Sequence, residues 1–157
     1  MKWRQDLQPG TALKVSFESC PVLESMGVLG RKWALIVIRN IAFYHKQRFN
    51  DMIRFTPGLS RRTLALRLKE LQKEGLIEVV ERRRNSLKWG LTPKGRDVLP
   101  VLMTLAQFGV KWHADAVFSD KTSRSLRDVF TDAFIQRYME SPAYSVVLKN
   151  PQIQDRK

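Results

Sequence analysis

The segment from Ser60 to Glu74 has two chemically opposed faces, and this feature constrains the fold more than any other part of the chain. At 100° per residue, Leu64, Leu68 and Leu71 fall within about 60° of each other and form one apolar stripe. A Thr-Pro-Gly turn precedes the segment, Ser60 is a favourable N-cap, and Gly75 supplies a C-terminal stop. The pattern therefore predicts a helix whose leucines lie in a core and whose other face carries cations.

The flanking sequence predicts further helices and one hairpin. Apolar residues recur at helical spacing on both sides of this segment, whereas two short stretches alternate as strands do. The predicted helices cover 21–29, 32–43, a short stretch from Phe49, 60–74, a long helix from Thr92-Pro93 to about Trp112, and about 123–140. The predicted strands cover 76–82 and 87–91, with a turn at 83–86. This order indicates a mainly α fold with a small β-hairpin (α+β), arranged as a winged helix-turn-helix.

The chain has 157 residues, enough for one domain with an appended helical piece. We expect an N-terminal arm over 1–19 and a winged helix-turn-helix domain over 20–113, which includes the long helix. Residues 114–157 are then a C-terminal helical extension that ends in a polar tail from about Ser141.

Positive charge is concentrated in the middle of the chain. The whole sequence carries a formal charge of +13, and the stretch 31–96 alone holds 17 Lys and Arg against five acidic residues. A surface that only needs solubility does not require its charge in one block. The distribution therefore predicts a polyanionic partner, and its overlap with the helix-turn-helix pattern favours double-stranded DNA.

The helix at 60–74 is the predicted recognition helix, because a major groove admits an α-helix and its base edges accept hydrogen bonds from Arg and Lys. Four residues of its first turns are predicted to reach base edges or the groove floor, namely Arg61, Arg62, Thr63 and Leu66. Ser60 is expected to donate to a phosphate at the helix N-terminus. Arg67 and Lys69 are expected to contact phosphates, which position a protein without specifying sequence.

The hairpin is the predicted wing. Arg82, Arg83 and Arg84 lie at its tip, with Lys88 close across the turn. Like charges this close repel each other unless an anion screens them. A narrow minor groove supplies the negative potential that arginine exploits, and we expect these four residues to contact DNA.

The stretch from Cys20 to about Trp112, roughly 60% of the chain, resembles the HxlR-type winged-helix regulators, relatives of the MarR class. The residues that carry the resemblance are Cys20-Pro21-Val22, Leu29-Gly30-Arg31-Lys32-Trp33, Arg48-Phe49-Asn50-Asp51-Met52, Pro57 to Leu64, Arg67 to Leu71, Glu74 to Ile77 and Leu91 to Gly95. The resemblance implies a homodimer on a palindromic operator, paired through N-terminal and C-terminal helices. Lys88-Trp89-Gly90 departs slightly from the family pattern, and the region after Trp112 lies beyond the family core.

Dimerisation also has an argument from the residues. Apolar side chains cover much of the circumference of the long helix, and a two-fold partner commonly covers such a surplus. The candidate dimerisation residues are Val22, Leu23, Leu102, Leu105, Phe108 and Trp112. The alternative is that the C-terminal extension covers the surplus within one chain.

Cys20, the single cysteine, precedes Pro21 at a predicted helix N-terminus, where the helix dipole and nearby basic residues favour the thiolate. Several members of the resembled family sense oxidants or electrophiles through a cysteine at this place. We therefore hypothesise that Cys20 is a redox sensor, whose oxidised form requires a disulfide between subunits or a small-thiol cap. The alternative is a small buried residue at the dimer interface.

The sequence offers no pattern for catalysis or a cofactor. The two histidines, His45 and His113, have no Cys or carboxylate at ligand spacing, which argues against a metal site. Gly-rich phosphate loops, nucleophile elbows and HExxH motifs are missing from the sequence. Without a signal peptide or an apolar stretch of membrane length, we expect a cytoplasmic protein that is not an enzyme. The effector, if the protein has one, is unknown.

Two other functions remain open. A winged helix can contact RNA or another protein, although the face from Ser60 to Lys73 has none of the aromatic residues on which RNA bases stack. A sequence-independent architectural DNA-binding protein would share the charge but not a preference among sequences.

Overall fold

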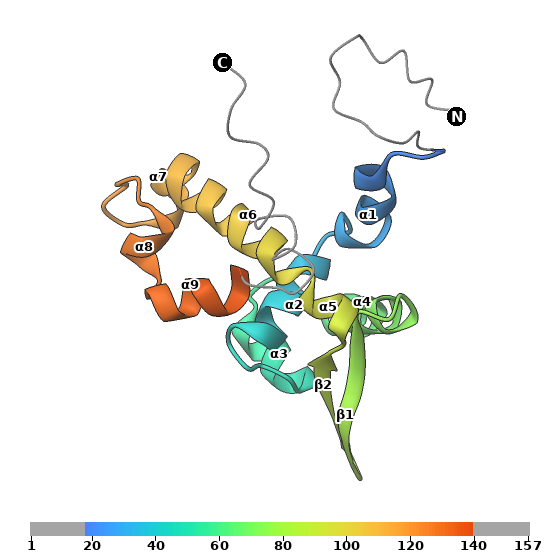
Figure 1. Cartoon of the computed structure of the whole chain (residues 1–157). Helices are drawn as coiled ribbons and strands as arrows, with labels where there is room; N and C mark the ends of the chain where they lie inside the picture. Colours follow the sequence, from blue (N-terminus) through green and yellow to red (C-terminus); the bar gives the residue numbers. More distant parts are fainter. Residues whose placement is uncertain (1–17, 140–157) are drawn as a thin grey trace.

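We describe residues 18–139 of a computed structural model, in which a two-stranded hairpin projects from a group of helices (Figure 1). The elements in chain order are α1 (Pro21–Leu29), α2 (Ala34–Ala42), α3 (Phe49–Phe55), α4 (Arg61–Lys73), β1 (Ile77–Arg83), β2 (Ser86–Leu91), α5 (Pro93–Arg96), α6 (Leu99–Trp112), α7 (Ala114–Val117), α8 (Leu126–Val129) and α9 (Asp132–Met139). The predicted N-terminal arm, except its last two residues, and the polar tail lie outside the described residues. Within residues 18–139 no helix is long and apolar enough to cross a membrane.

The core lies between α2, α4, α6 and the hairpin. The three leucines of the predicted stripe, Leu64, Leu68 and Leu71, are buried in it, as the sequence predicts. From α2, Val37 and Ile38 are fully buried against them. Burying side chains of this kind contributes about 1.5–3 kcal/mol each, so the leucine stripe fixes which face of α4 turns outward.

Helix α2 begins two residues later than the predicted start at 32. Trp33 has φ of 77°, a left-handed conformation that is unusual for a bulky residue, so the helix starts at Ala34. Asn40 is fully buried in α2 and donates through its amide nitrogen to the Thr56 hydroxyl at 2.7 Å. This bond connects α2 to the turn that precedes α4, and the sequence pattern did not reveal it.

The predicted long helix from Thr92-Pro93 to Trp112 is wrong as one element, because it is divided into α5 and α6. Pro100 lies in the first turn of α6. Its ring nitrogen cannot donate to the carbonyl four residues earlier, which explains the interruption. Gly95 in α5 packs against the Leu76 carbonyl so closely that any Cβ there would overlap it.

The hairpin pairs in antiparallel fashion from Ile77 opposite Leu91 to Arg83 opposite Ser86, with a bulge between Val79 and Glu81. The turn is therefore shorter than the predicted 83–86 and consists of the two residues 84–85. The Trp89 amide donates to the Gln47 carbonyl at 2.9 Å, which holds β2 against the segment that leads into α3. The base of the hairpin is thus fixed to the helices, whereas its tip projects away from them (Figure 1).

The C-terminal extension folds back from the end of α6 toward α2 (Figure 1). The predicted single helix over 123–140 is wrong, because Phe130 adopts an extended conformation that separates α8 from α9. Phe130 stacks on Phe134, and Phe134 in turn contacts Phe43 and Tyr138 edge-on. The Tyr138 hydroxyl donates to the Ala42 carbonyl at 2.9 Å, so α9 is docked on the end of α2.

Candidate nucleic-acid interface

The outer face of α4 presents cations that no carboxylate of residues 18–139 neutralises. Arg62 and Lys69 are exposed, and in residues 18–139 neither forms an ion pair. Leu66 lies on the same side and is 48% exposed, although leucine is usually buried. The helix therefore offers an apolar side chain flanked by free positive charge, while its leucine stripe holds the orientation from behind.

The first turn of α4 is preorganised. The Ser60 hydroxyl accepts from the Thr63 amide at 3.1 Å, which is the predicted N-cap, and it lies 2.8 Å from the Thr63 hydroxyl. Arg61 donates to the Asn50 side-chain oxygen at 3.1 Å, and its guanidinium lies 5.9 Å from the Phe49 ring centre. Arg61 is thus held toward α3, which makes Arg62 the arginine of this turn without a protein partner in the described part of the chain.

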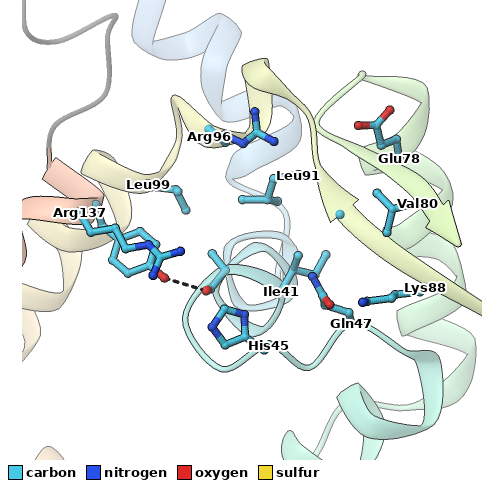
Figure 2. Close-up of a pocket in the computed structure, with 13 residues that line it drawn as sticks. Ile41, His45, Gln47, Glu78, Val80, Lys88, Leu91, Arg96, Leu99 and Arg137 are labelled. Atoms are coloured by element: carbon cyan, nitrogen blue, oxygen red, sulfur yellow. Dashed lines mark hydrogen bonds between the residues drawn. The ribbon is translucent and has the colours of Figure 1, made fainter. Parts of the chain in front are cut away.

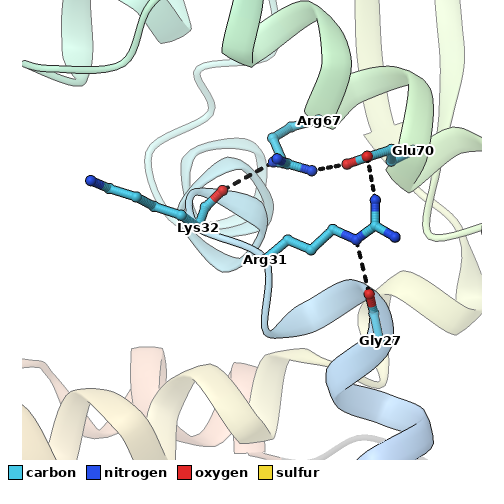
Figure 3. Close-up of polar contacts among 5 residues, drawn as sticks. All are labelled: Gly27, Arg31, Lys32, Arg67 and Glu70. Carbon is cyan, nitrogen blue, oxygen red and sulfur yellow. Dashed lines mark hydrogen bonds and ion pairs between the residues drawn. The ribbon is translucent and has the colours of Figure 1, made fainter.

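Arg67, for which a phosphate contact is predicted, already has partners within the protein. Figure 3 shows its guanidinium between α4 and the segment before α2, where it forms an ion pair with Glu70 and donates to the Lys32 carbonyl at 3.0 Å. Glu70 also pairs with Arg31, which in turn donates to the Gly27 carbonyl of α1 at 2.9 Å. The Arg67 side chain is only 15% exposed, so its charge is used inside the protein to hold α4 against α1 and α2.

A groove of about 1020 Å³ separates α4 from the wing, with α3 at its base. Its charged lining residues are Arg48, Asp51, Arg54, Lys69, Arg82, Arg83 and Arg84. Six cations thus face one carboxylate. Arg48 and Arg54 were not among the predicted contact residues, because the short helix α3 has no periodic signal beyond its apolar residues. The groove continues the positive surface of α4 toward the tip of the hairpin.

The three tip arginines are not equivalent. Arg82 and Arg84 are exposed and form no ion pair within residues 18–139, whereas Arg83 pairs with Glu81. Arg48 also pairs with Glu81, at 3.0 Å. Hydrogen bonds from Arg48, which has the larger effect, and from Arg83 hold the pKa of the Glu81 carboxyl below its ordinary value. Part of the predicted wing charge is therefore neutralised at Arg83, and the free charge is at Arg82 and Arg84.

Lys88 lies on a different face of the hairpin from the groove. Successive side chains of a strand point to opposite faces, and Leu87 and Trp89 face the groove. Lys88 instead lines a separate cavity on the other face of the hairpin. It therefore does not extend the row of tip arginines along the groove.

Exposed apolar side chains lie on α1 and α6, in the upper part of the molecule in Figure 1, away from the hairpin tip. On α1, Val22 is 69% exposed and Leu23 is exposed beside it. On α6 the stripe consists of Val101, Leu105, Phe108 and Trp112, of which Trp112 is 65% exposed. Leu102, predicted to lie at a dimer interface, instead belongs to the core of its own chain and is 7% exposed.

The extension covers another face of α6. Helix α9 packs against α6, which is the alternative left open by the sequence, but the apolar stripe remains uncovered by residues 18–139.

Cys20 is half-buried at the N-cap of α1, and its carbonyl accepts from the Glu24 amide at 3.0 Å. Glu24, an anion in the first turn of α1, accepts from the Ser19 hydroxyl. Among residues 18–139, no group of three His, Cys, Asp or Glu could hold a metal ion.

Comparison with known proteins identifies the family. The family described as "HxlR-like helix-turn-helix" matches residues 28–117. The regulator YdeP of Bacillus subtilis is 33% identical over 102 residues, which cover 61% of this chain and 76% of YdeP. YybR of the same organism is 34% identical over 98 residues, which cover 59% of this chain and 74% of YybR. Both bear the description "HTH-type transcriptional regulator".

Solved structures agree with the fold. A MarR-family regulator from Porphyromonas gingivalis is 33% identical with a TM-score of 0.54, and the match covers 64% of this chain and 99% of that one. An HxlR-family transcription factor from Thermoplasma volcanium is 31% identical with a TM-score of 0.50, covering 59% and 84%. The predicted winged helix-turn-helix is thereby confirmed. The chain belongs to the HxlR-like helix-turn-helix family of transcriptional regulators.

Proposed function

We propose that this regulator binds double-stranded DNA in a sequence-specific manner, as a homodimer on a palindromic operator. The observation that carries the proposal is the outer face of α4, where Arg62, Leu66 and Lys69 are exposed and the leucine stripe is buried behind them. An α-helix inserted into the major groove with such side chains outward can donate hydrogen bonds to base edges. Arg61, Thr63 and Ser60 belong to the same proposed contact through the first turn.

The wing contributes nonspecific attraction in this proposal. Arg82 and Arg84 project from the hairpin tip, and Arg54 lies in the groove between the wing and α4. Exposed arginines without carboxylate partners are free to neutralise phosphates and release counterions. We assign Arg67 to holding α4 in place, and Arg83 to a weaker contribution because Glu81 already balances its charge.

Selection of bound duplexes from a random pool at near-physiological salt tests the proposal. The expected result is a palindromic motif whose half-sites lie about 10 base pairs apart, measured from centre to centre. Because this is one helical turn, both half-sites then face the same side of the duplex. Enrichment of duplexes without any common motif would instead support an architectural DNA-binding protein. Failure to bind any duplex would overturn the proposal and favour an RNA-binding or protein-binding module.

Homodimerisation is supported by the apolar stripe on α6 and the exposed residues of α1. Val101, Leu105, Phe108 and Trp112 recur at a spacing of three or four residues, which aligns them on one side of the helix. A contiguous exposed apolar surface of this kind marks a protein interface. Sedimentation measurements on Phe108→Glu should give a monomer, whereas the control Val117→Glu, also at an exposed apolar residue, should stay dimeric. A dimer that survives Phe108→Glu would refute this interface.

We further propose that Cys20 responds to oxidants. It is partly accessible at the N-cap of α1, the helix that bears Val22 and Leu23. Two thiols from two subunits would lose two protons and two electrons to an added oxidant such as diamide and form an intersubunit disulfide. Diamide should release DNA from the wild-type protein, and a nonreducing gel should then show a disulfide-linked dimer. DNA binding by Cys20→Ser should not change on addition of diamide. Equal release from both proteins would eliminate Cys20 as the sensor.

A further inference from the structure

A second cavity, of about 470 Å³, lies on the face of the hairpin opposite the groove (Figure 2). Its walls come from three parts of the molecule that are distant in sequence. The end of α2 and the loop after it form one side, β1 and β2 form another, and the start of α6 together with α9 closes the third. Cavities of 300–1000 Å³ with mixed lining are the usual size for small-molecule sites.

Positive charge dominates the polar lining. Lys88, Arg96 and Arg137 line the cavity, and the single carboxylate among its lining residues is that of Glu78. Within residues 18–139, neither Arg96 nor Arg137 forms an ion pair. Figure 2 shows Arg137 extending from α9 toward the space in the centre, with Arg96 above this space and His45 below it. A guanidinium held in this position can bind a carboxylate through two parallel hydrogen bonds.

The rest of the lining is apolar. Ile41, Leu91 and Leu99 line the cavity, with Leu99 between Arg137 and Arg96 and with Ile41 below Leu91 (Figure 2). Val80 packs over Gly90 on the hairpin side, where a Cβ on the glycine would come within 2.6 Å of the valine methyl group. The Tyr138 hydroxyl is already bonded to the Ala42 carbonyl, so the tyrosine presents mainly its ring. The cavity thus combines an apolar body with cations at its rim.

We propose that this cavity binds a small organic carboxylate that has an apolar body. The carboxylate would pair with Arg137 and Arg96, and the body would lie against Leu91 and Leu99. The match to the HxlR-like family ends at residue 117, and Arg137 comes from the extension beyond it. The site therefore belongs to this chain and depends on the docking of α9, rather than on the shared winged helix-turn-helix alone.

A bound carboxylate would connect α9 to the segment at the base of the wing. Arg96 is the last residue of α5, the short helix that follows β2, and Lys88 and Val80 lie on the hairpin itself. A ligand that bridges these residues binds more tightly to one orientation of the wing, and it therefore shifts the wing toward that orientation. This consequence for DNA binding rests on the function proposed above, whereas carboxylate binding does not.

The first experiment titrates the full-length protein, without DNA, with 2-naphthoate and its neutral analogue 2-naphthamide, following amide chemical shifts. We expect 2-naphthoate to bind with a Kd of about 1 mM or tighter, shifting Gly90 and the α9 amides, and 2-naphthamide to bind at least tenfold more weakly. Arg137→Gln and Arg96→Gln should each weaken 2-naphthoate about tenfold. The control Arg127→Gln removes an exposed arginine of α8 outside the cavity and should have no effect.

Equal affinity for the two probes, or equal loss in Arg127→Gln, would mean that 2-naphthoate senses only the net positive charge, and either result overturns the site. A second experiment measures the effect of 2-naphthoate on operator affinity, in wild type and in Arg137→Gln. Binding of 2-naphthoate without any change in operator affinity would remove the regulatory consequence and leave the site. Failure of the duplex selection would remove the proposed function, also without affecting the titration.

Discussion

Helix α4 and the hairpin both carry exposed arginines, but they are held very differently. Helix α4 is packed into the core through Leu64, Leu68 and Leu71, and Glu70 links it through Arg67 and Arg31 to the neighbouring segments. The hairpin is fixed at its base, while its tip projects as two strands alone (Figure 1). Side chains on a fixed helix can select hydrogen-bond geometry, whereas those on a protruding tip supply mainly charge.

This contrast indicates how the two elements divide the work in the proposed DNA complex. Sequence discrimination should depend on α4 and its packing, because base contacts tolerate little displacement. Overall affinity and its dependence on salt should depend more on Arg82 and Arg84. The predictions below test this division, beginning with the change expected to have the largest effect.

Replacing a leucine on the inner face of α4 should have the largest effect. Leu64→Ala removes a fully buried side chain and should lower the free energy of unfolding by about 2–5 kcal/mol in a denaturant titration. The matched control Leu66→Ala, on the outer face of the same helix, should stay within about 0.5 kcal/mol of wild type. Similar losses in both variants would show that α4 is not oriented as described.

Arg62→Ala should alter which duplexes are selected. Loss of one bidentate contact to a base edge reduces discrimination at that base pair by about 1–3 kcal/mol, so a position of the motif should become degenerate. The duplex selection described above, repeated with the variant, measures this. Lys73→Ala serves as the control, because it removes a cation at the far end of the same helix. A motif unchanged by Arg62→Ala would contradict the assignment of α4 to base recognition.

Arg84→Ala should weaken binding to all duplexes by a similar factor. A lost phosphate contact reduces the slope of log K against log salt by about 1 without changing the preferred sequence. Arg83→Ala should reduce the slope less, because Glu81 already balances Arg83. Affinity measured across a salt series distinguishes the two. A larger effect at Arg83 than at Arg84 would show that the ion pair with Glu81 opens on DNA.

The smallest expected effect concerns pH. Because Arg48 and Arg83 lower the pKa of Glu81, the folded state binds this proton less readily than the unfolded state does. The bonds from the two arginines to Glu81 therefore stabilise the folded state at pH values above the ordinary pKa of 4.5. This contribution is lost as the pH falls through the lower pKa that Glu81 has in the folded state. NMR titration of the Glu81 carboxyl should give a midpoint below 4.5. Arg48→Gln should raise this midpoint, and Arg83→Gln should raise it by a smaller amount. Arg82→Gln should leave it unchanged, and a shift there would contradict the pairing.

The sequence predicted elements whose signals are local. The leucine period and Ser60 defined α4 almost to the residue, and the alternation around Trp89 located the hairpin. Exposed Arg62 and Leu66 on the outer face followed from the same periodicity, because burying the leucines leaves the opposite side to solvent. The proposed DNA contacts themselves stay predictions.

What the sequence did not reveal depends on contacts between distant residues. Arg67 differs from Arg62 because it donates to the carbonyl of Lys32, which lies 35 residues away, whereas its ion pair with Glu70, three residues on, is a local signal that was overlooked. Arg137 has no helical or strand pattern that relates it to Arg96, and only the return of α9 brings both to one cavity. The division of the long helix had a local cause in Pro100, a signal that was present and was overlooked.

The contact between Gly95 and the Leu76 carbonyl has a consequence for the spacing of the wings. The backbone of α5 and the residue that precedes β1 touch there without an intervening side chain. The start of α6 is consequently held at one fixed offset from the root of the hairpin. In a dimer joined through α6, the same offset recurs on both sides of the symmetry axis and helps to determine the span between the two wing tips. A side chain at residue 95 would increase this offset in each subunit of such a dimer, so Gly95 would help to set the distance between the two wings.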